Sequence, residues 1–222
     1  MIIPNMTPAE VVAEARKDIP SIMRKLREPL ARLQRQHMKG DRSKVLEVMH
    51  TYRSQGRNNW LIMIRVAKKG VQLCMMTYYR GVDQKLRAAI VTPKGTCYHF
   101  SAHVIERYGE RFDSTNDPVI RLQSFFRENY LIACETLDQV GEQEFAMVAG
   151  MAHGMAMGTW DRSSNVICLA TFINHGQLSD MQAQVAEKLD IQRELSVMSH
   201  GQRIDLLNAI KRRVREEEAA VA

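Results

Sequence analysis

Residues 59 to 100 carry the pattern that most constrains the fold of this chain. Four short apolar runs follow one another there, WLIMIRVA, VQLCMMTYYR, LRAAIVTP and TCYHF, and turn residues such as Lys68-Lys69-Gly70 and Lys94-Gly95 lie between them. Short apolar runs broken by turn residues are typical of consecutive antiparallel strands. This stretch therefore predicts a meander of up to four strands.

A second meander is predicted after two helices. The spacing of apolar residues favours a helix over 101–112, and Asp117-Pro118 begins a second helix that we expect to run to about Gln139, before Gly141. The three runs that follow, EFAMVAG, GMAMGTWD and NVICLATFIN, are separated by glycine-rich or polar turns. They predict three more antiparallel strands.

Both ends of the chain read as helical. Thr7 and Glu10 match a capping box, and Pro20 and Pro29 predict that residues 7–38 form two or three helical pieces ending near Gly40. Capping-box spacing from Ser179 to Gln182 and from Ser199 to Gln202 predicts helices at about 180–190 and at 202–218, and we expect a further short helix over 42–52.

Together these elements predict an α+β fold of antiparallel meanders with helices on one side and with helical N- and C-terminal segments. We expect three parts. Residues 1–56 form a basic helical segment, residues 57–176 form the antiparallel sheet with its two central helices, and residues 177–222 form C-terminal helices packed on the same domain.

The charge of the chain is moderately positive and unevenly placed. The 31 Lys and Arg outnumber the 25 Asp and Glu, which gives a net charge of +6. Residues 16–44 hold ten cations against three acids, and residues 57–111 hold another ten against three. A positive field concentrated in this way favours phosphate-rich partners, so we expect RNA or another nucleic acid as the partner.

The cysteines and the apolar runs indicate a reducing, cytoplasmic location and no membrane partner. The four cysteines are widely spaced without a C-x-x-C pair, which favours free thiols. No apolar run approaches the ~20 residues that a membrane span needs, and the first residues lack the pattern of a secretory signal.

The stretch HFSAHVIERYGERF, residues 99–112, carries the candidate site. On a helix, residues four apart share one face. The stretch therefore places a polar stripe of His103, Arg107 and Arg111 beside an apolar stripe of Val104, Tyr108 and Phe112. Two arginines one turn apart can grip phosphate oxygens, and a histidine can transfer a proton at the same group. An alternative is that Glu106 and Glu110 pair with these cations and the stripe is a solvated surface.

A second proton-transfer group would be needed for catalysis. His175, which follows the strand LATFIN, is the first candidate, and Tyr108 is the second. Zinc would accept Cys97, His99 and His103 as ligands, but the first two lie in a predicted strand and the third in the next helix, with no fourth ligand apparent. We therefore expect no metal and no cofactor.

The order of these elements resembles a known group of enzymes. A helix with H-x-x-x-R-Y-x-x-R, a second helix and a three-stranded meander ending in ICLATFIN, over residues 101–174, resemble the small toxin-type ribonucleases of the barnase, EndoU, colicin and RelE-like superfold. The resemblance implies RNA cleavage without a metal, with His103 as acid or base and with Arg107 and Arg111 holding the phosphate. Residues 1–100 have no counterpart in the minimal toxin domain.

Three functions compete at this point. The first is a nucleic-acid-directed protein that acts as a metal-independent ribonuclease. The second is a non-catalytic nucleic-acid-binding or regulatory protein that uses Arg24, Arg27, Arg32 and Arg35 as a phosphate-binding surface. The third is an assembly protein, a homo-oligomer that pairs through its amphipathic end helix.

Overall fold

One mixed sheet holds all the strands that the computed structural model shows in residues 1–112, 115 and 117–197, the part of the chain it describes. Its strand order is β1-β2-β3-β4-β5-β9-β8-β7-β6. The strands are β1 (Leu46–Arg53), β2 (Asn59–Ala67), β3 (Gly70–Arg80), β4 (Leu86–Ile90), β5 (Cys97–Phe100), β6 (Ala133–Gln139), β7 (Glu144–Met151), β8 (Gly154–Asp161) and β9 (Val166–Asn174).

The two predicted meanders are halves of this sheet. Strands β2 to β5 form the first and β7 to β9 the second, as the sequence indicates. The parallel pair β5–β9, in register from Cys97↔Val166 to Phe100↔Leu169, joins them. Parallel neighbours need a long crossover connection, and the helices and strands between β5 and β9 supply it. The α+β class is confirmed, with one mixed sheet in place of purely antiparallel meanders.

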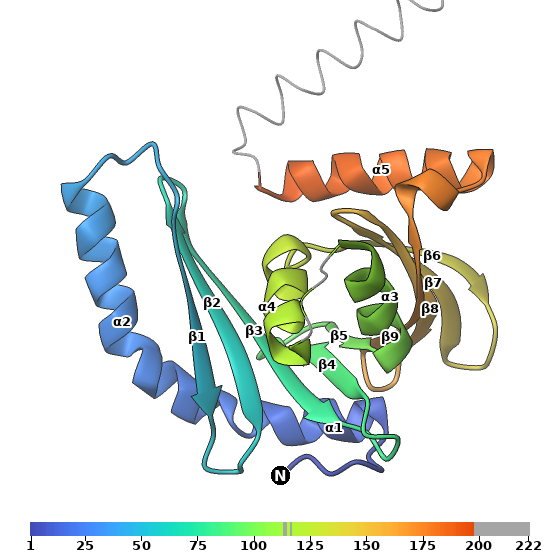
Figure 1. Ribbon diagram of the computed structural model, residues 1–222, viewed down its shortest axis with the longest axis horizontal. Coiled ribbons are helices and arrows are strands. Elements are labelled where there is room, and N and C mark those ends of the chain that lie inside the picture. The colour runs from blue at the N-terminus through green and yellow to red at the C-terminus, as the bar shows by residue number, and fades with distance from the viewer. Residues whose placement is uncertain (113–114, 116, 198–222) are drawn as a thin grey trace, which may run out of the picture.

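Helices cover both faces of the sheet, not one as the sequence suggested. The sheet curves around α3 (Ala102–Phe112) and α4 (Pro118–Glu128), which lie on its inner face (Figure 1). The helices α1 (Pro8–Arg16), α2 (Ile19–Lys39) and α5 (Asp180–Val197) lie on the outer face. The reason is visible in β2, where Trp60 to Ile64 are all buried, because a strand that is apolar on successive residues must be covered on both faces.

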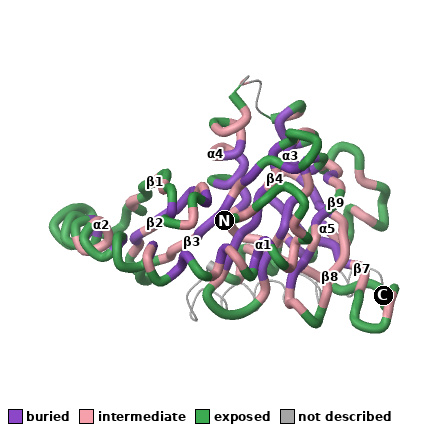
Figure 2. The backbone as a smooth tube through the Cα atoms, turned by 90° about the horizontal axis from the view of Figure 1, so that it is seen from below, coloured by how far each residue is buried: buried purple, intermediate pink, exposed green. Residues whose placement is uncertain are grey.

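The largest core lies on the inner face. Phe100, Tyr108, Phe125 and Phe126 are each at most 2% exposed there, between the two central helices and the strands. A second core joins α1 and α2 to the outer face of the first half, and a small one joins α5 to β7 and β8. Burial is highest along the central strands, whereas much of α2 is exposed at one end of the molecule (Figure 2).

One predicted helix is wrong, and another begins at Asp117-Pro118 as predicted but is shorter than expected. Residues 46–53, which overlap most of the expected helix 42–52, form the edge strand β1, which pairs with β2 from Leu46↔Val66 to Arg53↔Asn59. The expected helix 117–139 ends at Glu128, and β6 follows. Asn129 ends that helix because its buried side chain donates to the Phe125 carbonyl and accepts from the Ala152 N–H.

The other helix starts are as predicted within the described residues: the capping box at Thr7 and Glu10 is formed, and Ser179 with Gln182 caps α5. Residues 7–38 form two helical pieces, but the break expected at Pro29 is absent, since α2 continues through it to its end before Gly40. Helix α5 runs to Val197, beyond the expected end near 190. The predicted helix 202–218 lies outside the described residues. None of the helices in the described ranges is long and apolar enough to cross a membrane.

Candidate nucleic-acid interface

Helix α3 is anchored through its apolar stripe. Ser101 fixes its start, since the Ser101 hydroxyl donates to the Ala170 carbonyl on β9 at 2.8 Å and accepts from the Val104 N–H. Val104 is fully buried and Tyr108 is 2% exposed, but Phe112 is 41% exposed. The helix is therefore held firmly on the sheet, and its polar side is left at the surface.

The polar stripe of α3 makes few contacts. His103 is exposed, and the Arg107 Nη1 lies 3.6 Å from the Glu110 Oε2, with both side chains about half exposed. Arg111 is half-buried, and its Nη1 has no hydrogen-bond partner among the described residues. The Glu106 carboxylate pairs with Lys85 on the adjoining turn at 3.0 Å. Part of this side is thus a set of surface ion pairs, which contribute little to stability.

The histidine that reaches α3 is His153, not His175. The His153 ring stacks on Phe112 with centroids 4.6 Å apart, and its Nδ1 lies 3.1 Å from the Tyr108 hydroxyl. The His175 side chain turns to α5, where its Nε2 lies 4.0 Å from Asp190. The β7–β8 turn and the end of β9 are neighbours in the sheet, as the predicted meander of these strands implies, but the sequence does not show which of the two histidines meets α3.

His153 does not complete a catalytic pair with His103. It contacts the last residue of α3, whereas His103 is the second residue of that helix. Nine residues of α-helix separate those positions, which is about 13 Å along the axis. One scissile phosphate group is too small to be reached by both imidazoles in this arrangement.

A buried histidine–tyrosine pair lies on the outer face. The Tyr79 hydroxyl and the His99 Nε2 are 2.8 Å apart, beside a cavity of about 230 Å³ that Arg87 and the segment Pro4–Pro8 also line. Burial lowers the pKa of His99 to about 4, and the nearby Arg87 charge adds to this. Burial raises the pKa of Tyr79 to about 12. Both groups are therefore neutral near pH 7, and Arg87 is held by Asp83 in two hydrogen bonds.

The thiols and the cysteine–histidine cluster do not form a reactive site. Burial raises the pKa of Cys74 and Cys168 to about 11 and that of Cys134 to about 12, so these thiols stay protonated at neutral pH. Cys97 and His99 lie in β5 on the outer face, whereas His103 lies on α3 on the inner side. The three side chains considered as zinc ligands do not come together.

The outward side of α2 is strongly basic. Its buried side consists of Ile19, Ile22, Leu26, Leu33 and His37, which pack on the sheet. Six cations and one acid, Glu28, are exposed on the other side. The cations are Arg24, Lys25, Arg27, Arg32, Arg35 and Lys39. All four arginines that the sequence proposed for nucleic-acid binding are therefore at the surface.

These cations have few acidic partners. Arg32 lies 3.5 Å from Glu28, but the two side chains are 74% and 81% exposed, so water screens the pair. Lys25 lies over the Tyr52 ring at 5.0 Å, a contact that leaves its charge uncompensated. The electrostatic potential over the outward side of α2 is consequently positive, because its cations are not neutralised by a network of ion pairs.

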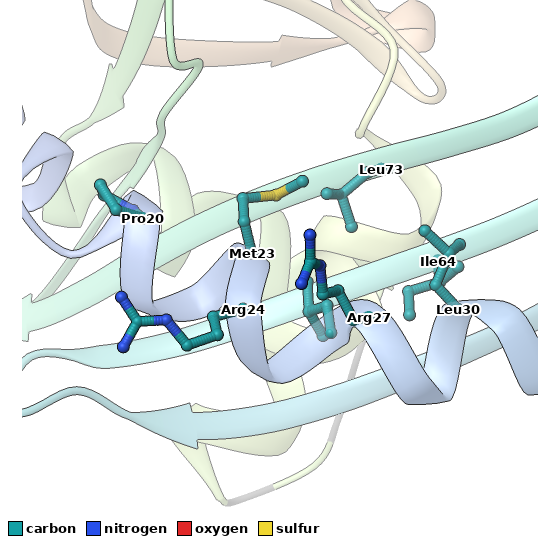
Figure 3. Close-up of a pocket in the computed structure, with 8 residues that line it drawn as sticks. Pro20, Met23, Arg24, Arg27, Leu30, Ile64 and Leu73 are labelled. Atoms are coloured by element: carbon teal, nitrogen blue, oxygen red, sulfur yellow. The ribbon is translucent and has the colours of Figure 1, made fainter.

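A groove runs beside this basic surface. Its first hollow, of about 390 Å³, lies between α2 and strands β2 and β3. Figure 3 shows Met23 and Arg27 projecting from α2 on the side of Leu73, and Arg24 extending the other way. Its lining comprises Pro20, Met23, Arg24, Leu26, Arg27, Leu30, Ile64 and Leu73.

A second hollow, of about 420 Å³, continues the groove toward the β2–β3 turn. Arg35, Lys68 and Gln34 line it, together with apolar side chains of both strands. His37 also lines it; the residue is only 6% exposed, and both ring nitrogens are buried without a hydrogen-bond partner in the described structure. No acidic side chain of the described residues lines either hollow.

The groove is the feature that sequence reasoning missed. The arginines of α2 could be found from charge alone, whereas the groove needs β2 and β3 to lie beside the helix.

The chain matches no protein-family model, no curated protein and no solved structure.

Proposed function

We propose that this protein binds nucleic acid through the basic outward surface of α2. The observation that carries the proposal is the ratio of six exposed cations to one exposed acid along that single helix. A 21-residue helix is about 31 Å long, so these charges form an elongated surface that can follow a phosphate backbone. Arginine is well suited to such contacts because its planar group donates two parallel hydrogen bonds to phosphate oxygens.

Binding without cleavage is favoured over a ribonuclease. In the part of the chain that the structure describes, neither His175 nor His153 stands beside His103 as a second proton-transfer group, because His175 faces α5 and His153 lies at the far end of α3. RNA cleavage at α3 is tested directly by incubating the protein with labelled RNA in excess chelator. Cleavage that disappears on His103→Ala would replace the proposal of binding alone with that of the metal-independent ribonuclease.

The binding proposal predicts a large effect of four substitutions. Changing Arg24, Arg27, Arg32 and Arg35 together to alanine should weaken binding of a short labelled RNA about 100-fold at low salt. Each arginine that binds a phosphate releases a counterion from the RNA, and each substitution removes that contribution to the affinity. The slope of log K against log salt should become shallower by about 3. Fluorescence anisotropy across a salt series measures both quantities.

A charge-matched control separates this surface from net charge. Alanine at Arg80, Lys94, Arg162 and Lys188, four exposed cations outside α2, lowers the net charge from +6 to +2 just as the α2 variant does. The control should bind within about threefold of the unchanged protein. An equal loss in both variants, or no binding by the unchanged protein at low salt, would refute the proposal.

A further inference from the structure

The groove beside α2 has a floor of cross-strand apolar pairs. Ile64 lies opposite Leu73, and Val66 lies opposite Val71, as successive pairs on the same face of the β2–β3 ladder. The first pair lines one hollow and the second pair lines the other, so the two hollows share one continuous floor. On the β3 side of this floor Val71 is 38% exposed and Leu73 is half-buried, whereas Ile64 and Val66 on the β2 side are buried. The apolar surface that α2 leaves uncovered is therefore on β3.

Cations border this floor along its whole length. Arg24 and Arg27 line the first hollow, and Arg35 and Lys68 line the second. The α2 residues that line the groove run from position 20 to position 38, which is about 27 Å of helix. That length accommodates about eight nucleotides at the stacked spacing of about 3.4 Å per nucleotide.

An apolar floor with a cationic border distinguishes two forms of nucleic acid. A duplex presents phosphates to the border, but its base faces are stacked inside and cannot reach the floor. The bases of a single strand can be turned onto an apolar surface while the phosphates remain at the arginines. We propose that the groove binds single-stranded nucleic acid, with bases on the β2–β3 floor and phosphates at the border; this inference rests on the proposed function.

The border favours a nucleic acid over a protein segment as the occupant. The positive charge continues around α2 from the groove to Lys25, Arg32 and Lys39, beyond what a helix seated in the groove would contact. A phosphate backbone carries charge along its full length and can use the whole set. The Arg27 guanidinium, which lies beside the floor in Figure 3, also offers a planar group for a base.

The test uses the floor and leaves the cations in place. Val71→Thr with Leu73→Thr keeps residues that favour strands but adds hydroxyls to the floor. The unchanged protein should bind a short single strand more tightly than the duplex of the same sequence. The double variant should lose about tenfold in affinity for the single strand and should bind the duplex unchanged.

The control variant places the same chemistry elsewhere. Val82→Thr with Val140→Thr changes two valines that are 72% and 57% exposed outside the groove, and it should leave both affinities unchanged. In the unchanged protein, methyl resonances of Val71 and Leu73, the two floor residues that α2 leaves accessible, should shift on adding the single strand. This second measurement does not depend on how well any variant folds.

The outcomes separate this inference from the proposed function. Equal affinity for single strand and duplex, with no effect of the floor variant and no methyl shift, would overturn the inference even if the four α2 arginines remain essential. If the unchanged protein binds neither the single strand nor the duplex at low salt, both the inference and the proposed function are wrong. If an acidic amphipathic peptide rich in Leu and Glu shifts the same methyls and the single strand does not, the groove is a protein-docking surface and the inference is wrong.

Discussion

Tyr108→Ala should lower the free energy of unfolding by about 4 kcal/mol, as expected for a fully buried aromatic residue. Tyr108 is 2% exposed, and its ring meets Phe125 edge-on at 5.0 Å and Phe172 at 5.8 Å. Removing the ring therefore leaves a cavity between α3, α4 and β9. Urea unfolding followed by circular dichroism measures the change.

Tyr108→Phe provides the matched comparison. It keeps the ring contacts and removes only the hydroxyl that lies 3.1 Å from the His153 Nδ1, so it should cost about 1 kcal/mol. A cost of less than about 1 kcal/mol for Tyr108→Ala would contradict the burial and mean that the apolar stripe does not anchor α3. Comparable costs for both variants would instead place the energy in the polar contact.

The elements that the sequence predicted are those set by local pattern. The strands β2 to β5 and the helix α3 follow from apolar periodicity and turn residues, which act over a few neighbours. The same holds for the caps at Thr7 and Ser179. Such features need no knowledge of the rest of the chain.

The missed elements depend on distant partners. β1 is a strand because it pairs with β2, and its burial pattern alone does not distinguish it from a helix. That the two meanders form one sheet is compatible with the sequence but not determined by it, because it depends on β5 meeting β9, about 70 residues later in the chain. Helices on both faces follow from that single sheet.

The candidate site divides in the same way. The exposed arginines of α2 could be predicted because helical spacing puts apolar residues on one side and charges on the other. The groove could not be predicted from the sequence, because its floor comes from β2 and β3, and their position beside α2 depends on the tertiary fold. His153 could not be assigned to α3, because the contact depends on which end of the sheet its turn occupies.

The stability of the protein should fall on acidification, and His99 should account for about 3 kcal/mol of the loss between pH 7 and pH 4. Burial, with a contribution from the Arg87 charge, lowers the pKa of His99 from 6.5 to about 4 in the folded state. At pH 7 the imidazole is neutral in both states and has no effect. Below about pH 6.5 the unfolded chain binds a proton at His99, whereas the folded protein does not. The free energy of unfolding therefore falls with pH until His99 is also protonated in the folded state, near pH 4.

Comparison with His99→Gln isolates this contribution from the carboxylates, which titrate in both proteins. The free energy of unfolding of the variant should depend less on pH over this window, and the difference between the two curves should change by about 3 kcal/mol between pH 7 and pH 4. Tyr79→Phe should keep the pH dependence, because burial rather than the Tyr79 hydroxyl is the main cause of the lowered pKa. Parallel curves for the unchanged protein and His99→Gln would contradict this prediction, because they would show that His99 has the same pKa in the folded and the unfolded state. The burial of His99, which is 6% exposed, argues against that outcome, since a protonated imidazole there would hold its charge away from water.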